Sequence, residues 1–234
     1  MRTYWQALKF DKRDIHIYWL LISAPILLTL YRYYGYPEAF YRIIGETENS
    51  EIYSRLWQFG FFFLLLMVIP LLSTRFFKDL HLSAMGLGLG DYKIGLKLVI
   101  VAIPFIVLPI IYFAADMPEL RSEYPLAKIL LQDHSSILTY ELSYIFFYYI
   151  AWEFFFRGFL LFGLLPKFGA MNAVLIQTIS SCLIHIGKPE GEIIGSILVG
   201  IIFGAIALRT RSIWYVFLVH AAIGVMTDLF IIFK

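Results

Sequence analysis

The sequence predicts an all-α, polytopic integral membrane protein: a bundle of about seven transmembrane helices, with a distinct four-helix core in its C-terminal half. Composition carries the first part of this prediction, because 60% hydrophobic, 18% aromatic and 15% charged residues and a mean hydropathy of +0.76 are far from soluble-globular values. The apolar residues also gather into segments near the ~20 residues that a helix needs to cross a bilayer. No alternating ten-residue pattern typical of a membrane β-barrel occurs in the sequence.

Three apolar segments come first along the chain: residues 17–34, 56–74 and 94–114. Their centres carry no Asp, Glu, Lys or Arg, so we expect them to form a supporting shell. An amphipathic N-terminal lead-in precedes them and is expected at the membrane surface. Together these segments make up a first region, residues 1–136. The loop after the second span contains three alternating glycines, Gly86, Gly88 and Gly90, which miss the G-x-G-x-x-G pattern and predict a flexible turn.

The last four spans carry the ionisable residues. These spans are predicted at residues 137–165, 170–187, 192–208 and 212–233. Their ionisable residues are Glu141, Glu153, Arg157, His185, His220 and Asp228. Since a charge near the centre of a spanning helix costs roughly 2.5–3.5 kcal/mol, such residues mark functional positions, and we place the function in residues 137–234. The sixth span repeats small residues every four positions, at Ser196, Gly200 and Gly204, which lets two helices of one bundle approach closely.

The distribution of Lys and Arg favours a multi-pass protein of the cell membrane with a cytoplasmic N-terminus. The net charge of +2 is small and scattered, and no basic run is interleaved with aromatic residues, so nucleic acid is not an expected partner. Cys182 is the only cysteine, which excludes an intrachain disulfide and a cysteine-ligated zinc cluster. We interpret it as a buried apolar residue.

Glu153 and Arg157 lie four residues apart in an apolar stretch long enough to cross a membrane. An acid one helical turn before a base is the favoured order for an i,i+4 ion pair. Two unpaired charges would offset the insertion energy of many leucines, so the pair is expected to face the interior of the bundle. The residues alone leave two uses open: a pair that only holds the helix, and a carboxylate that works as a general base.

His185 ends the fifth span and His220 lies within the seventh. At ~1.5 Å per residue, Glu153, His185 and His220 would lie roughly 18, 22 and 12 Å from the inner ends of their helices. Each histidine alone is compatible with a structural role. Together with Glu153 they are expected to meet near mid-membrane and to surround one water-accessible cavity.

These residues resemble the CAAX-protease and bacteriocin-processing family, also called the Abi or type II CAAX prenyl endopeptidase-like family. The likeness covers residues 137–233 and rests on Glu-x-x-x-Arg-Gly at 153–158, a histidine ending the next span, and Ser-Ile-Trp at 212–214 before a histidine in a later span. The resemblance implies a four-helix catalytic-type core and an intramembrane endopeptidase. Its site residues would be Glu153, His185, His220 and Arg157.

The chain departs from this family at several positions. Members usually carry two adjacent glutamates, of which the second matches Glu153; the first, which activates water, is Trp152 here. The aromatic residue usual before the first histidine is Ser181, and the Asn or Asp usual after the last histidine is Gly224. Asp228 lies one further turn on, rotated about 80° from His220 on an ideal helix, which makes it a poor geometric substitute.

The loop after His185 contains three further charges. Glu192 lies at the start of the sixth span, where its carboxylate is expected to interact favourably with the positive end of the helix dipole. Lys188 and Glu190 are expected to be solvated loop charges.

Two histidines and a carboxylate also fit a divalent metal, although His-Glu-x-x-His is absent and no helix offers two ligands at i,i+4. The sequence leaves a metal and a glutamate mechanism both open, and names no certain cofactor.

The leading hypothesis is hydrolysis of membrane-anchored, lipidated or hydrophobic peptides. Membrane lipid is the other expected partner, because it surrounds the helix bundle. Glu153 and His185 would activate water, His220 would stabilise the oxyanion, and Arg157 would orient Glu153. Because Trp152 and Gly224 depart from the family pattern, a second hypothesis stays open: a non-proteolytic relative that binds a lipid or lipoprotein, or assists a membrane transferase. A purely structural membrane partner is the third.

Overall fold

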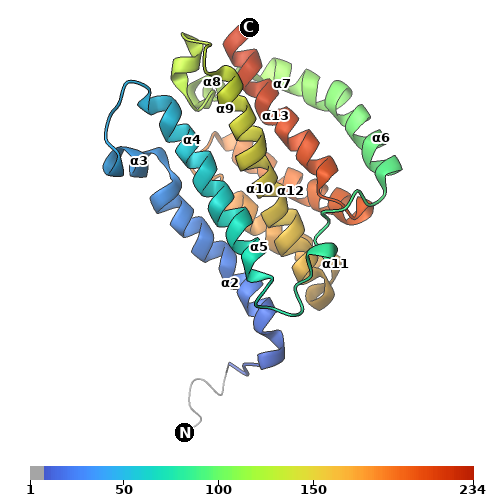
Figure 1. The fold of residues 1–234 in the computed structure, drawn as a ribbon. Coiled ribbons are helices and arrows are strands. Elements are labelled where there is room, and N and C mark those ends of the chain that lie inside the picture. The colour runs from blue at the N-terminus through green and yellow to red at the C-terminus, as the bar shows by residue number, and fades with distance from the viewer. Residues whose placement is uncertain (1–7) are drawn as a thin grey trace.

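The computed structural model describes residues 8–234 and shows a helical bundle there, with no strand among these residues (Figure 1). Most of the predicted N-terminal lead-in, residues 1–7, lies outside the described residues. Among the described residues, six helices are long and apolar enough to cross a membrane. The longest, Ile137–Leu183, has 47 residues, about twice what one crossing needs, and breaks at Gly169 (φ 74°, ψ 170°). Its two parts match the fourth and fifth predicted spans, so the expected bundle of about seven helices is confirmed.

The first region contains the elements that lie outside the core. They are α2 (Ile15–Leu30) with the π-helical turn Tyr31–Gly35, α3 (Pro37–Ile43), α4 (Ser50–Phe63), the π segment Leu64–Val68, α5 (Ile69–Ser73), α6 (Tyr92–Ala102), the π segment Ile103–Val107 and α7 (Leu108–Ala114). Short 3₁₀ turns at Lys12–Asp14 and Leu82–Ala84 accompany them. In Figure 1, α2 and α4 lie on one side of the bundle, while α6 and α7 pack along α13 on the other.

The second region holds the elements that carry the candidate site. They are α9 (Ile137–Ser143), the π segment Tyr144–Tyr149, α10 (Ile150–Glu153), the π segment Phe154–Phe162, α11 (Gly163–Leu183), α12 (Glu190–Thr210) and α13 (Trp214–Phe233). The last elements of the first region, α8 (Pro118–Glu123) and the 3₁₀ turn Lys128–Leu131, come just before them. The run from α9 to α10 passes between α4 and α13 (Figure 1). Every residue from 151 to 161 is buried, as expected for a helix that is apolar on all faces and therefore needs neighbours all round.

The small residues of α12 bring it close to α11, as the sequence predicted. A Cβ at Gly200 would lie 2.8 Å from Thr178 Cγ2, and one at Gly204 would lie 3.2 Å from Val174. The close approach also lets the Gln177 side-chain amide donate a hydrogen bond to the Gly200 carbonyl at 2.9 Å. Small residues at four-residue spacing therefore pack two helices of one bundle together.

The prediction of a flexible turn at the three alternating glycines is wrong for the loop as a whole. Its backbone carbonyls accept hydrogen bonds from the turn and first residues of α13: Gly86 from the Ile213 amide at 2.9 Å, and Leu87 from the Trp214 indole at 2.7 Å. Gly90 has φ +52°, and a Cβ there would lie 2.9 Å from the Arg211 carbonyl oxygen. The loop therefore fixes the end of α13 that leads to His220.

Replacing Gly90 with alanine should destabilise the protein more than replacing Gly88. A positive φ costs a non-glycine residue roughly 1–2 kcal/mol, and the added methyl group would press against the backbone at Thr210 and Arg211. Gly88 is the matched control, because a Cβ there meets nothing within 4 Å. Thermal unfolding in detergent should show a lower midpoint for Gly90→Ala only; equal midpoints for the two variants would contradict the fixed-loop assignment.

Candidate functional site

Glu153 and Arg157 form a buried ion pair at the centre of the bundle. Glu153 ends α10, and Arg157 lies one turn further in the π segment that follows. Arg157 Nη1 lies 3.2 Å from Glu153 Oε1, and the two side chains are only 2% and 0% exposed. The guanidinium also lies over the Phe203 ring of α12, 5.5 Å from its centroid. The expected interior i,i+4 pair is thus confirmed, and each charge has lost its contact with water.

His220 joins this pair from α13. Its Nδ1 lies 2.6 Å from the same Glu153 oxygen that Arg157 contacts. A carboxylate can only accept, so the imidazole donates from Nδ1 and its Nε2 stays available on the other side of the ring. The second oxygen, Oε2, is buried and has no hydrogen-bond partner within residues 8–234. One carboxylate oxygen therefore orients both the guanidinium of Arg157 and the imidazole of His220.

His185 is held separately, in the turn after α11. Its Nδ1 lies 2.7 Å from the backbone carbonyl oxygen of Ser181, which can only accept a hydrogen bond. Nδ1 therefore carries the proton, and the lone pair is on Nε2. Burial lowers the pKa of His185 to about 4. At neutral pH this side chain is an uncharged imidazole with a free basic nitrogen.

Trp152 packs against both histidines. Its indole centroid lies 5.1 Å from that of His185 and 5.6 Å from that of His220. Phe62 of α4 stacks on the same indole at 5.6 Å, and Trp152 is 3% exposed. The structure thus collects Glu153, His185 and His220 in one cluster, but Trp152 fills space beside both imidazoles.

The expectation that all three residues surround a water-accessible cavity is wrong for Glu153, which is fully buried. Its carboxylate contacts protein donors directly.

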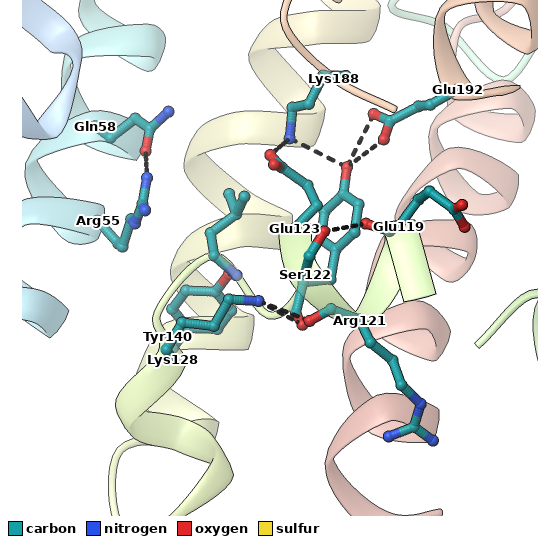
Figure 2. Close-up of polar contacts among 12 residues, drawn as sticks. Arg55, Gln58, Glu119, Arg121, Ser122, Glu123, Lys128, Tyr140, Lys188 and Glu192 are labelled. Carbon is teal, nitrogen blue, oxygen red and sulfur yellow. Dashed lines mark hydrogen bonds and ion pairs between the residues drawn. The ribbon is translucent and has the colours of Figure 1, made fainter. Parts of the chain in front are cut away.

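The predicted role of Lys188 as a solvated charge is wrong. Lys188 pairs with Glu123 at 2.6 Å and donates to the Tyr124 hydroxyl at 3.2 Å, and the Tyr124 hydroxyl donates to both oxygens of Glu192 at 2.9 and 3.0 Å. Figure 2 shows Lys188, Glu123 and Glu192 converging from three segments of the chain. Glu192 still lies in the first turn of α12, while Glu190 beside it is exposed as expected. This network connects the end of α8 and Tyr124 to the loop that follows His185.

Glu141 and Asp228 take no part in the cluster. Both are buried, and all four of their carboxylate oxygens lack a hydrogen-bond partner within residues 8–234. Asp228 therefore does not replace the polar residue that the family pattern places at Gly224. Cys182, expected to be buried, is partly buried.

Tyr149 is the site residue that sequence reasoning missed. A Cβ at Gly224 would overlap the Tyr149 hydroxyl, so this hydroxyl occupies the space of the missing side chain. Its ring lies 4.8 Å from that of His220. The available signal was spacing: Tyr149, Glu153 and Arg157 recur every four residues.

In the site as folded, the carboxylate of Glu153 and the imidazole of His220 are hydrogen-bonded to each other directly. Within residues 8–234, no group of three His, Cys, Asp or Glu side chains is arranged to hold a metal ion.

Because Glu153 and Arg157 share one buried contact, their substitutions should be coupled. Glu153→Gln leaves a buried guanidinium without its countercharge, and Arg157→Met leaves the carboxylate with His220 alone. The double variant should lose less unfolding free energy than the sum of the single variants, by about 0.5–3 kcal/mol. Reversible unfolding of the four proteins in detergent measures this difference, and strict additivity would show that the charges do not interact.

Comparison with known proteins found one family model that covers the candidate site. Residues 134–226 match the family model of the Rce1-like type II CAAX prenyl endopeptidases. No curated protein and no solved structure matches the chain. The matched region contains Glu153, Arg157 and both histidines. Residues 134–226 are thus similar to the Rce1-like type II CAAX prenyl endopeptidases, and this likeness covers the part of the chain that carries the candidate site.

Proposed function

We propose that this protein is an intramembrane endopeptidase that hydrolyses membrane-anchored, lipidated or hydrophobic peptides. The family is one of membrane proteases, which supports peptide-bond hydrolysis in general. The observation that carries the proposal is the Glu153–His220 hydrogen bond of 2.6 Å, held in a buried cluster beside a second imidazole. Buried charge of this kind is costly in a membrane and is retained at functional sites.

His185 is the general base in this proposal. It is uncharged at neutral pH, its Nδ1 is fixed by the Ser181 carbonyl, and its Nε2 is free to take a proton from water. Glu153 is less suited to that task, because its side chain is fully buried and one oxygen already accepts from both Arg157 and His220. This assignment replaces the sequence-based hypothesis that Glu153 activates water.

Glu153 acts as a positioning residue for His220. The carboxylate fixes the imidazole ring through its contact with Nδ1, and Arg157 in turn fixes the carboxylate. A protonated His220 can donate from Nε2 to the oxyanion that forms on the scissile carbonyl.

The substrates we propose are peptides that bring their own apolar anchor. The cluster lies among helices long and apolar enough to span a membrane, so a cleavable bond reaches it only when the adjoining chain or lipid partitions into the bilayer. Membrane lipid surrounds the bundle in this proposal, and prenylated or hydrophobic peptides are the first class to test.

One observation favours a second candidate, a relative that binds a lipid or lipoprotein or assists a membrane transferase. Trp152 packs against both imidazoles, and Glu153 is closed to solvent. Such a protein would keep the cluster for stability and would need no access for water.

Cleavage of prenylated and hydrophobic reporter peptides by the full chain in lipid nanodiscs tests the proposal. The native protein should cleave, and His185→Gln should lower kcat by about 10²–10⁴-fold, the usual contribution of general-base assistance. Glu153→Gln should lower kcat while KM stays unchanged, because it disturbs the orientation of His220 and not the binding of substrate. Unchanged kcat in His185→Gln would overturn its assignment as the base.

The pH profile gives an independent test of His185. A base must be unprotonated to work, and because burial lowers the pKa of His185 to about 4 from 6.5, the unprotonated form persists well below pH 6. The acid limb of kcat/KM should therefore lie near pH 4. An acid limb near pH 6.5 would indicate a solvated imidazole and contradict the buried base.

Trp152→Glu separates the two candidate functions. If the native chain cleaves and Trp152→Glu adds nothing, the endopeptidase proposal holds with His185 as base. If the native chain is inactive on a broad panel and Trp152→Glu gains cleavage, the native protein is the non-proteolytic relative.

A further inference from the structure

Gly224 lets one side chain reach α13 at unusually short range. It lies one helical turn after His220, and a Cβ at this position would lie 2.5 Å from Cζ and 2.9 Å from Cε2 of Tyr149, overlapping the hydroxyl oxygen. Only glycine leaves room for this approach. The hydroxyl group of Tyr149 therefore lies against the α13 backbone, one turn from the imidazole.

The helical run that contains Tyr149 and Glu153 is antiparallel to α13. Two residues one turn apart on the first helix therefore contact two residues one turn apart on the second, in reverse order. Glu153 contacts His220, and Tyr149, four residues before Glu153, contacts Gly224, four residues after His220. The Tyr149 and His220 rings are 4.8 Å apart and inclined by 59°. The phenol and the imidazole thus reach the same space between α10 and α13.

We propose that the Tyr149 hydroxyl, placed by the missing side chain of Gly224, donates a hydrogen bond to the oxyanion formed during hydrolysis, beside His220. This inference rests on the proposed function and adds a catalytic residue to it. Neither the family match nor any residue motif assigns this tyrosine a role.

In the step concerned, His185 Nε2 takes one proton from water as the water oxygen bonds to the scissile carbon. The carbonyl π bond breaks and places a negative charge on oxygen, which accepts from His220 Nε2–H and Tyr149 O–H without taking either proton. When the carbonyl re-forms, the C–N bond breaks and the proton on His185 passes to the leaving amine. The hydrogen bond from the Tyr149 hydroxyl is therefore strongest in the tetrahedral intermediate, when the oxygen carries its negative charge.

Tyr148 provides a matched control. It is the chain neighbour of Tyr149, lies in the same π segment, and packs on Phe62 with ring centroids 4.2 Å apart, toward α4 and away from the Tyr149–Gly224 contact. Replacing Tyr148 with phenylalanine removes a hydroxyl from the same aromatic cluster. Loss of packing alone would affect both tyrosines.

The experiment compares native protein, Tyr149→Phe, Gly224→Ala, the double variant and Tyr148→Phe in nanodiscs. Each is assayed for kcat, KM, thermal midpoint, and affinity for a phosphinic peptide, whose tetrahedral phosphorus carries the negative oxygen of the intermediate. Tyr149→Phe should lower kcat by about 10²-fold, the usual loss for one oxyanion donor, and weaken phosphinate binding similarly, while KM stays unchanged. Tyr148→Phe should match the native protein.

Gly224→Ala keeps the hydroxyl but forces it away, so it should show the same loss. The double variant should be no worse than either single variant, because both remove one hydrogen bond. Native cleavage with unchanged kcat in Tyr149→Phe would overturn the inference and leave the proposed function intact. Equal losses in Tyr149→Phe and Tyr148→Phe would overturn it in favour of packing. Absence of cleavage by the native chain would overturn the proposed function, and this inference with it.

Discussion

A carboxylate that has lost all contact with water is the constraint on which the rest of the structure depends. Glu153 is completely buried in a helix that crosses an apolar medium, where an uncompensated charge costs several kcal/mol. Its compensation comes from Arg157 on the same helix and from His220 on α13. That second contact ties α10 to α13 at one level and so determines which residues of the two helices face each other, Tyr149 and Gly224 included.

The sequence specified the outline of this arrangement because its signals are local. Apolar length predicted the spans, and the cost of buried charge predicted that Glu153 and Arg157 pair. The depth of His185 and His220 in their predicted spans, together with the family resemblance, singled out both histidines, which no local spacing connects to Glu153. The small residues of α12 likewise gave a correct prediction, since Gly200 and Gly204 act through their own absent side chains.

Predictions failed where the outcome depended on what packs against a residue from a distant part of the chain. The loop with Gly90 resembled a flexible turn, because nothing local indicates that its carbonyls accept hydrogen bonds from residues more than 100 positions later. Lys188 resembled a solvated charge until Glu123 and Tyr124 were brought beside it. Gly224 does lack the polar side chain of the family pattern, but nothing local indicates that a side chain from another helix occupies its space.

The π-helical segments on either side of α10 have a consequence for how this protein tolerates changes of length. A π turn holds one residue more than an α turn, and such turns recur at functional sites. The segment Phe154–Phe162 separates the α-helical turn that ends in Glu153 from the arm that leads to His185. Removing one residue there would relax the wide turn to an ordinary one and keep the helix continuous, yet it would rotate Glu153 away from α13. A single-residue deletion in this segment is therefore expected to break the Glu153–His220 contact while the helix itself stays continuous.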